Sequence, residues 1–270
     1  MTTLAEAAAA VEQLWPLAGA EPWDAPGLVT GDPAAAVTRI MLAVDAVADT
    51  VDEAITIGAD LLLSHHPLLL RGVTTVAEST AKGALIARLI RGRCALIAAH
   101  TNADTVETGT SARLASLLGL TDARPIVETA PGLGLGRVGT LLEPTTLGAL
   151  ARRLAGILPA TATGVRVAGQ FDRPVHRVAV CGGAGDSLLA STAVRAADVY
   201  ITADLRHHPA SEAIETARVD GGPALIDVSH WASEWLWLDS AAAELRAIVP
   251  DVDVVVSELR TDPWDFVVVQ

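Results

Sequence analysis

Short runs of apolar residues alternate with longer helical segments along most of this chain. Runs of about five to seven residues have the length of strands, and the segments between them have the apolar spacing of helices. This alternation predicts an α/β fold with a mostly parallel sheet covered by helices. The expected strands span residues 39–45, 60–64, 94–99, 137–142, 164–168, 177–181, 198–202, 224–228 and 252–256, and the expected helices span 3–15, 50–58, 80–91, 109–118, 145–157, 186–196, 210–218 and 231–248.

The two halves of the chain repeat one order of features. Each half has a strand that begins with arginine, a second strand preceded by Ala-Asp, a His-His-Pro motif, and an apolar run that ends in a histidine followed four residues later by an acid. We interpret this order as an internal duplication that gives two similar α/β lobes with a site at their junction. The Pro- and Gly-rich stretch 121–136 suggests lobes of residues 1–125 and 126–270, with chain ends that can cross between them.

Charge and cysteine content limit the classes of partner and compartment. The net charge of −13 argues against binding to a nucleic-acid backbone, although it does not exclude a nucleotide held through metal. Cys94 and Cys181 adjoin apolar runs without a Cys-x-x-Cys motif, so we expect buried thiols in a reducing compartment. Neither a signal peptide nor an uninterrupted apolar run of about 18 residues is present, so we expect a cytoplasmic protein without membrane contact.

An adjacent histidine pair ends one of the expected strands. Leu61-Leu62-Leu63-Ser64 leads directly into His65, His66 and Pro67. Ligand sites in open α/β sheets lie outside the carboxyl ends of the strands, so two imidazoles at this place could each hold a metal ion. An isolated histidine pair is more often structural, but other potential ligands also follow strands in this chain.

Three further residues complete a ligand set. His230 and Glu234 are four residues apart, which places both on one face of a helix with a spacing used in zinc sites. Asp104 follows another strand. Outside this context a surface His–Glu hydrogen bond and an N-cap aspartate would explain these residues. Five ligands suffice for two divalent ions if Glu234 or Asp104 bridges them; zinc, iron, manganese, nickel and cobalt all suit such ligands.

The remaining histidines are candidates for proton transfer. His100 and His208 could act as a general acid or base, with His207 as the weaker candidate, and all three could also be structural relics of the repeat. Asp45 and Asp204 end strands near the site and could orient ligand histidines.

Two other patterns carry less information. The Gly-rich stretch 182–185 could cradle an anion or form a tight turn, and it lacks the motifs of nucleotide-binding loops, so we expect no organic cofactor. No motif of a covalent nucleophile is present.

The motifs in this order resemble the NIF3-like family, also known as GTP cyclohydrolase 1 type 2 or dinuclear metal centre hexameric protein. The resemblance implies two α/β lobes with a dinuclear site between them, and a homohexamer built as a trimer of dimers. The matching residues are Trp23-Asp24, Gly27-Leu28, Asp45, Ser64-His65-His66-Pro67, His100, Asp104, Gly182-Gly183, Asp204, His208, His230 and Glu234.

The resemblance also implies roles for the ligands and an activity. His65 and His66 would bind one ion each, Asp104 would join one of these ions, His230 the other, and Glu234 would bridge them. The implied enzyme is a metal-dependent hydrolase that acts on a small-molecule substrate, GTP, by ring opening with formate release. A phosphoesterase fits the same site, and a metal-binding or regulatory scaffold without catalysis is the alternative outside the enzymes.

Overall fold

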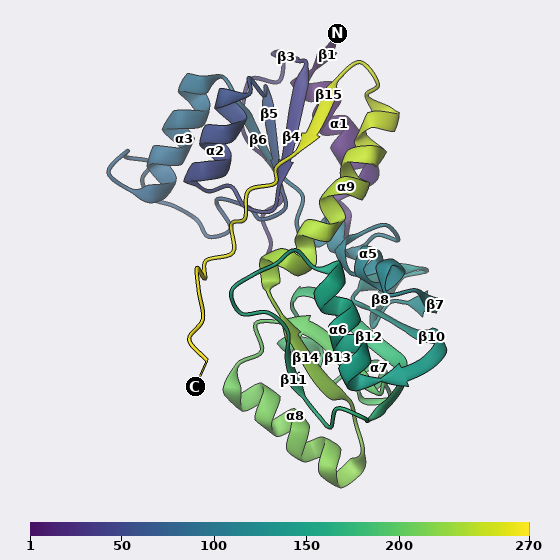
Figure 1. Cartoon of the computed structure of the whole chain (residues 1–270). Coiled ribbons are helices and arrows are strands. Elements are labelled where there is room, and N and C mark those ends of the chain that lie inside the picture. Colours follow the sequence, from purple (N-terminus) through teal and green to yellow (C-terminus); the bar gives the residue numbers. More distant parts are fainter. Residues whose placement is uncertain (270) are drawn as a thin grey trace. The chain divides into compact units, whose positions relative to one another are not determined.

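A computed structural model describes residues 1–269, and the chain divides into two compact units (Figure 1). The first unit contains residues 1–103 and 238–261, and the second contains residues 104–237 and the segment from Asp262 onward. This division differs from the predicted boundary at residues 125/126. Residues 104–125 belong to the second unit because helix α5 (Thr110–Leu117) packs in its core and strand β7 (Leu120–Arg124) pairs within its sheet.

The first unit is built on a five-stranded sheet in the order β15-β4-β5-β6-β2. Four strands are parallel and β2 is antiparallel to β6. Every residue of β5 and β6 is buried, as expected for strands covered on both faces. The strands are β2 (Gly27–Thr30), β4 (Arg39–Ala43), β5 (Leu61–Ser64), β6 (Ala95–Ala98) and β15 (Asp253–Val256), and β1 (Thr2–Thr3) pairs separately with β3 (Ala36–Val37).

Helices cover this sheet and close its core. Helix α1 (Leu4–Leu14) begins with a capping box, in which Thr3 accepts a hydrogen bond from the Glu6 amide and the Glu6 carboxylate accepts one from the Thr3 amide. Helices α2 (Ala48–Thr56) and α3 (Ala81–Gly92) pack together and share a hydrophobic cluster with β4, β5 and β6. The 3₁₀ helix η1 spans Leu17–Gly19. Helices α4 (Thr101–Thr105) and α9 (His230–Ile248) are each divided between the two units.

The second unit contains a six-stranded sheet in the order β11-β14-β13-β12-β10-β7. The three central strands β12, β13 and β14 are parallel, and the flanking strands are antiparallel to their neighbours. The strands are β7, β10 (Arg137–Thr146), β11 (Arg166–Ala168), β12 (Pro174–Ala184), β13 (Val199–Ala203) and β14 (Ala224–Val228), and β8 (Val127–Ala130) pairs with β9 (Leu133–Leu135) as a separate ribbon.

Strand alternation distributes the side chains of this sheet between two cores. Val178 and Val180 belong to a cluster with α5 and α6 (Leu147–Ile157), whereas Ala179 and Cys181 belong to a second cluster. The second cluster includes residues of the 3₁₀ helix η2 (Asp186–Leu188), α7 (Thr192–Arg195) and α8 (His207–Asp220). The sheet is therefore covered by helices on both faces. The predicted α/β class is confirmed, but this sheet is mixed rather than mostly parallel, because β7, β10 and β11 pair in antiparallel fashion.

The same hydrogen-bond pattern occurs in both units. The carboxylate of Asp60 accepts hydrogen bonds from the amides of Thr38 and Arg39 at the start of β4. The carboxylate of Asp198 accepts them from His176 and Arg177 in β12. These acids belong to the Ala-Asp pairs that precede the second strand of each half of the sequence.

Three predicted segments differ from the structure. The expected helix 186–196 is interrupted, because the Ser191 side chain accepts a hydrogen bond from Val194 N and starts α7 as a new helix. The Pro- and Gly-rich stretch 121–136, where no strand or helix was expected, contains most of β7 and the β8–β9 ribbon. Residues 16–33, which the expected strands and helices also leave out, contain β2. Within residues 1–269, no helix is both long and apolar enough to cross a membrane.

Both cysteines should resist alkylation in the folded protein. Cys94 and Cys181 are buried free thiols; burial raises the pKa of Cys94 to about 11, and burial with nearby Asp104 raises the pKa of Cys181 to about 12. At pH 8 a thiol with a pKa near 11 is about 0.1% thiolate, the reactive form. A mass-spectrometric time course with iodoacetamide should show modification only after unfolding in guanidinium. Rapid labelling of the native protein would contradict this prediction.

Candidate metal centre

The predicted histidine pair lies at the carboxyl end of β5 in the first unit. The amides of His65 and His66 donate to the carbonyls of Ala43 and Val44, at 3.0 and 2.8 Å, and so continue the pairing with β4 beyond Ser64. The backbone of both histidines is therefore fixed by the sheet.

Three imidazole rings converge in this unit. The ring centroids of His65, His66 and His100 are 5.1 to 5.5 Å apart, and one ligand atom from each residue lies within 4.8 Å of the other two. Such a group of imidazoles is typical of sites that bind transition-metal ions. His100, predicted for proton transfer, thus lies beside the two predicted ligands.

All three rings are oriented through Nδ1. Each Nδ1 lies within hydrogen-bond distance of a carbonyl or carboxylate oxygen. Because such oxygens accept hydrogen bonds, the proton belongs on Nδ1 and the lone pair on Nε2. The acceptors are Ala99 O for His65 (2.8 Å), Asp45 Oδ1 for His66 (2.7 Å) and Asp24 Oδ1 for His100 (2.8 Å).

Asp24 is a candidate functional residue for which no role was predicted from the sequence. Its carboxylate accepts hydrogen bonds from His100 Nδ1 and from the amide of Thr101 at 3.0 Å. Burial alone would raise the pKa of Asp24, but the hydrogen bonds from His100 and Thr101 outweigh burial and lower it. Asp24 is therefore an ionised group that holds His100 in place. Its sequence signal is the pair Trp23-Asp24 in a Gly- and Pro-rich segment, one of the motifs that resemble the NIF3-like family.

Thr261→Val should weaken metal binding through Asp45. The Thr261 hydroxyl donates to Asp45 Oδ2, while Asp45 Oδ1 accepts from His66 Nδ1. Without this hydroxyl the carboxylate is less well held, and loss of such an outer partner typically costs about 10–100-fold in metal affinity. Titration against a competing chelator measures the change. Thr261→Ser keeps the hydroxyl and should bind like the wild type; equal weakening by both substitutions would contradict the prediction.

The second unit holds the predicted His–Glu pair at the start of α9. His230 is the first residue of this helix, and its Nε2 lies 3.0 Å from Oε1 of the buried Glu234. His230 Nδ1 lies 2.7 Å from Asp204 Oδ2, and Asp204 has a left-handed backbone with φ of 57° between β13 and α8. The predicted helical face and the predicted orienting role of Asp204 agree with this geometry.

The neighbouring carboxylates control the protonation of His230. Burial lowers the pKa of this imidazole, but the charge of Glu234 and the hydrogen bond to Asp204 outweigh burial, so the pKa lies well above its usual value. The metal-free pair therefore carries a proton between His230 and Glu234. This proton must leave before Nε2 can bind a cation.

Gly183 forms a cradle for this pair. A Cβ on Gly183 would lie 2.3 Å from Glu234 Oε1 and 3.1 Å from His230 Nε2, and the residue has φ of +66°. Its amide donates to Ser233 Oγ at 2.9 Å. Gly182 and Gly183 thus lie at the end of β12, and Gly183 leaves room beside two potential ligand atoms.

The structure places the other predicted residues as follows. Asp104 lies in α4, where its Oδ1 accepts a hydrogen bond from the Thr110 hydroxyl. His207 and His208 are exposed in the first turn of α8, with ring centroids 5.2 Å apart, and belong to no cluster of potential ligands among residues 1–269.

Both units therefore offer donor sets that fit divalent transition metals. One contains three oriented imidazoles and the other an imidazole and a carboxylate beside a glycine cradle. Imidazole and carboxylate ligands suit zinc, iron, manganese, nickel and cobalt.

Comparison with known proteins assigns the family. The model of the Duf34/NIF3 (NGG1p interacting factor 3) family matches residues 2–263. The chain belongs to this family. Among curated members, it is 49% identical to the GTP cyclohydrolase 1 type 2 homolog of Streptomyces coelicolor, covering 98% of this chain and 94% of that protein. It is 36% identical to the homolog of the same name from Mycobacterium leprae, covering 97% and 95%.

Solved structures of the Duf34/NIF3 family show the same fold. The Bacillus cereus protein related to NIF3 superposes with a TM-score of 0.89 at 23% identity, covering 98% of this chain and 99% of that one. A hypothetical protein of Staphylococcus aureus gives 0.86 at 27% identity with the same coverage. The mixed α/β fold of this chain is therefore the fold of its family.

Proposed function

We propose that this protein is a metal-dependent hydrolase that holds two divalent ions and opens the purine ring of GTP with release of formate. The observation that carries the proposal is that four histidines have Nδ1 engaged by an oxygen atom, which directs Nε2 of His65, His66 and His230 to metal binding and Nε2 of His100 to proton transfer. They are His65 with Ala99, His66 with Asp45, His100 with Asp24, and His230 with Asp204. Three of these oxygens are carboxylate oxygens, the usual outer partners of metal-bound histidines.

The proposed ligands come from both units. His65 and His66 would each hold one ion, Asp104 and His230 would complete the two ligand sets, and Glu234 would be shared by both. Two bound divalent ions supply a water with a lowered pKa and stabilise negative charge on the substrate. The carboxylates of Asp45 and Asp204 keep their histidines oriented, which preserves the geometry of the site.

GTP is supported as the substrate by the names of the relatives. The curated relatives are called GTP cyclohydrolase 1 type 2 homologs. With a net charge of −13, the chain itself repels a triphosphate, so bound cations would be needed to hold one. In the proposed reaction water adds at C8 of the purine, the five-membered ring opens, and a second water releases C8 as formate.

Two assays test this proposal separately. Protein loaded with each candidate metal is incubated with GTP, and formate is measured with formate dehydrogenase while phosphate is measured in parallel. Metal-dependent formate release is the expected result. Phosphate without formate would indicate a phosphoesterase, and full metal occupancy without either product would indicate a metal-binding or regulatory scaffold; both results contradict the cyclohydrolase proposal.

His100→Ala should abolish turnover while leaving both ions bound. We propose that His100, held by Asp24, transfers protons, with His208 as a second candidate. Loss of a general acid or base typically costs about 10²–10⁴-fold in rate. Metal content and formate release measured on the same sample check this prediction. Loss of one ion would show instead that His100 is a ligand, as its position beside His65 and His66 permits.

We also propose that the metal site lies in a cleft between two lobes that arose by duplication. The matched hydrogen bonds of Asp60 and Asp198 support the duplication. A cytoplasmic homohexamer, built as a trimer of dimers, remains the proposed assembly.

A further inference from the structure

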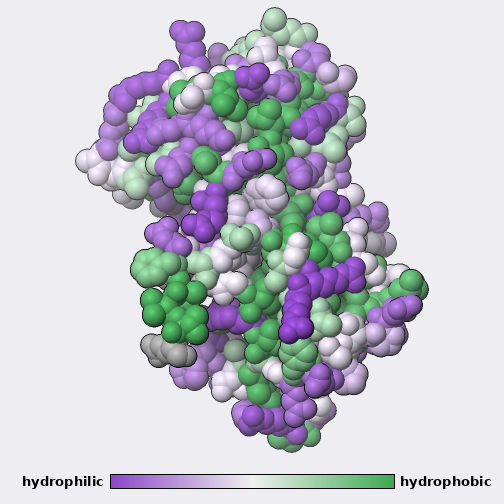
Figure 2. Space-filling model, in the orientation of Figure 1, coloured by the Kyte–Doolittle hydropathy of each residue, from purple (hydrophilic) through white to green (hydrophobic). Residues whose placement is uncertain are grey.

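The segment after Pro263 exposes a run of large apolar side chains. Five of its six residues from Trp264 to Val269 are apolar, none is in a helix or strand, and their exposed fractions range from 58% for Val267 to 88% for Val269. Figure 2 shows this hydrophobic surface beside the end of the chain. Large exposed apolar patches of this kind mark interaction sites. We call residues 264–269 the apolar tail.

The start of the apolar tail is anchored, whereas the tail itself is uncovered. Asp262 is buried and accepts hydrogen bonds from the Ser229 hydroxyl and, at 3.0 Å, from the amide of Trp264. The following valines and phenylalanine favour extended structure. The tail therefore leaves a fixed point of the second unit as an apolar segment that its own chain does not bury.

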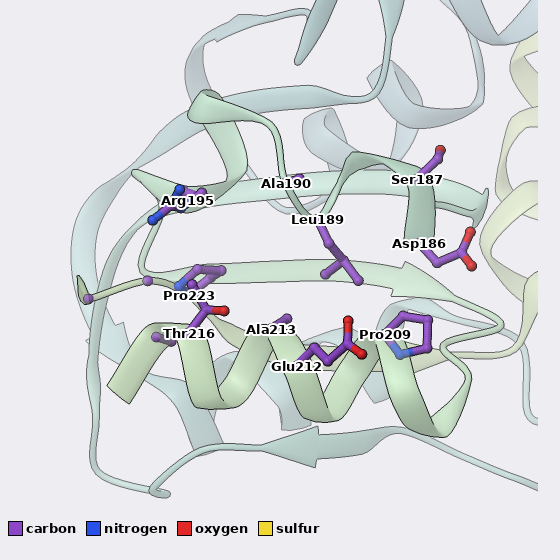
Figure 3. A pocket seen from close by; sticks show the side chains of 13 residues that line it. Asp186, Ser187, Leu189, Ala190, Arg195, Pro209, Glu212, Ala213, Thr216 and Pro223 are labelled. Atoms are coloured by element: carbon purple, nitrogen blue, oxygen red, sulfur yellow. The ribbon is translucent and has the colours of Figure 1, made fainter. Parts of the chain in front are cut away.

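A groove in the second unit lacks a cover of its own. Helix α8 has no fully buried residue among its fourteen, and a cavity of about 390 Å³ lies between it and the segment around Leu189. Figure 3 shows Leu189 directed towards α8 and Ala213 facing it from the helix. The apolar lining consists mainly of Leu189, Ala190, Pro209, Ala213, Ala217 and Pro223. We call this cavity the α8 groove.

We propose that the apolar tail of one copy of this chain docks in the α8 groove of a second copy. The groove has a volume in the range of ligand pockets, about 300–1,000 Å³, and its alanines leave space for an aromatic ring such as Trp264 or Phe266. The tail is 62% exposed at Trp264 and 79% at Phe266, so it does not fill the groove of its own chain.

The apolar tail carries little of the charge that opposes association of two copies. Each copy carries a net charge of −13, which opposes association, but the tail contains only one acid, Asp265. Burying its apolar side chains can therefore offset the repulsion between two acidic chains. Every copy supplies one tail and one groove, so the contact is head-to-tail and can close into a ring.

The first test removes the apolar tail or blocks the α8 groove. A chain that ends at Pro263 and the full-length variant Ala213→Arg should both sediment as smaller species than the wild type at equal concentration. Phe266→Asp with Val268→Asp tests the tail if the shortened chain does not fold. Val219→Arg places the same side chain on α8 at an exposed residue outside the groove and should assemble normally.

The second test measures the contact itself. A fluorescent peptide with the sequence of residues 261–269 is titrated into the chain that ends at Pro263. Saturable binding is expected, with at least about tenfold weaker affinity in the Ala213→Arg background because the arginine fills the groove and buries a charge, and unchanged affinity with Val219→Arg. Absence of binding, or equal binding to both variants, would overturn the proposal, as would a wild type of single-chain mass at all concentrations.

Discussion

Glu234→Ala should leave the protein folded but without bound metal. Glu234 is buried, its Oε1 lies 3.0 Å from His230 Nε2, and we propose that it bridges both ions. Its loss removes a ligand from each ion and the negative charge that favours cations at this place. The expected loss of affinity exceeds the roughly 10–100-fold that an outer hydrogen-bond partner contributes.

Metal content per chain, measured by inductively coupled plasma mass spectrometry, checks this expectation. Glu215→Ala is the matched control, because Glu215 is an exposed carboxylate in α8 that pairs with Arg218. The control should retain both ions, and circular dichroism should show that both variants are folded. Full occupancy in Glu234→Ala would contradict the bridging role.

Gly183→Ala should have an effect of similar size without removing any ligand. The added Cβ would lie 2.3 Å from Glu234 Oε1, closer than real Cβ contacts allow, and the left-handed backbone at φ of +66° is also unfavourable for alanine. The carboxylate or the end of β12 must move, so the two ligand atoms lose their arrangement. We expect metal content to fall to a small fraction of the wild-type value.

The neighbouring glycine provides the control for this substitution. A Cβ on Gly182 would first meet Thr110 at 3.4 Å, an ordinary contact, and the residue does not have a positive φ. Gly182→Ala should therefore bind metal normally. Equal metal content in the Gly182 and Gly183 variants would show that the cradle has no role in binding.

Local sequence patterns predicted the elements that carry the candidate ligands. The run Leu61–Leu63 forms a fully buried strand and puts His65 and His66 at its end, because a strand this apolar must lie inside the sheet. The proximity of His230 and Glu234 follows from helix geometry alone, so it could also be predicted from the sequence.

Features that depend on contacts between residues far apart in the sequence could not be predicted from the sequence. His100 and Asp24 are 76 residues apart, and their segments are brought together by the pairing of β2 with β6 and by hydrogen bonds such as that from the Glu21 amide to Thr101. The role of Gly183 depends on a helix that begins far along the chain. The boundary at residues 125/126 relied on Gly and Pro content, whereas the compact units follow sheet pairing and core packing.

The most direct test is the metal content of protein purified without added metal, measured per chain by native mass spectrometry and by elemental analysis. We predict about two divalent transition-metal ions per chain, lost at low pH and regained on reconstitution. A protein that remains without metal after reconstitution with zinc, iron, manganese, nickel and cobalt would show that these histidines are structural, and would contradict the proposed metal centre.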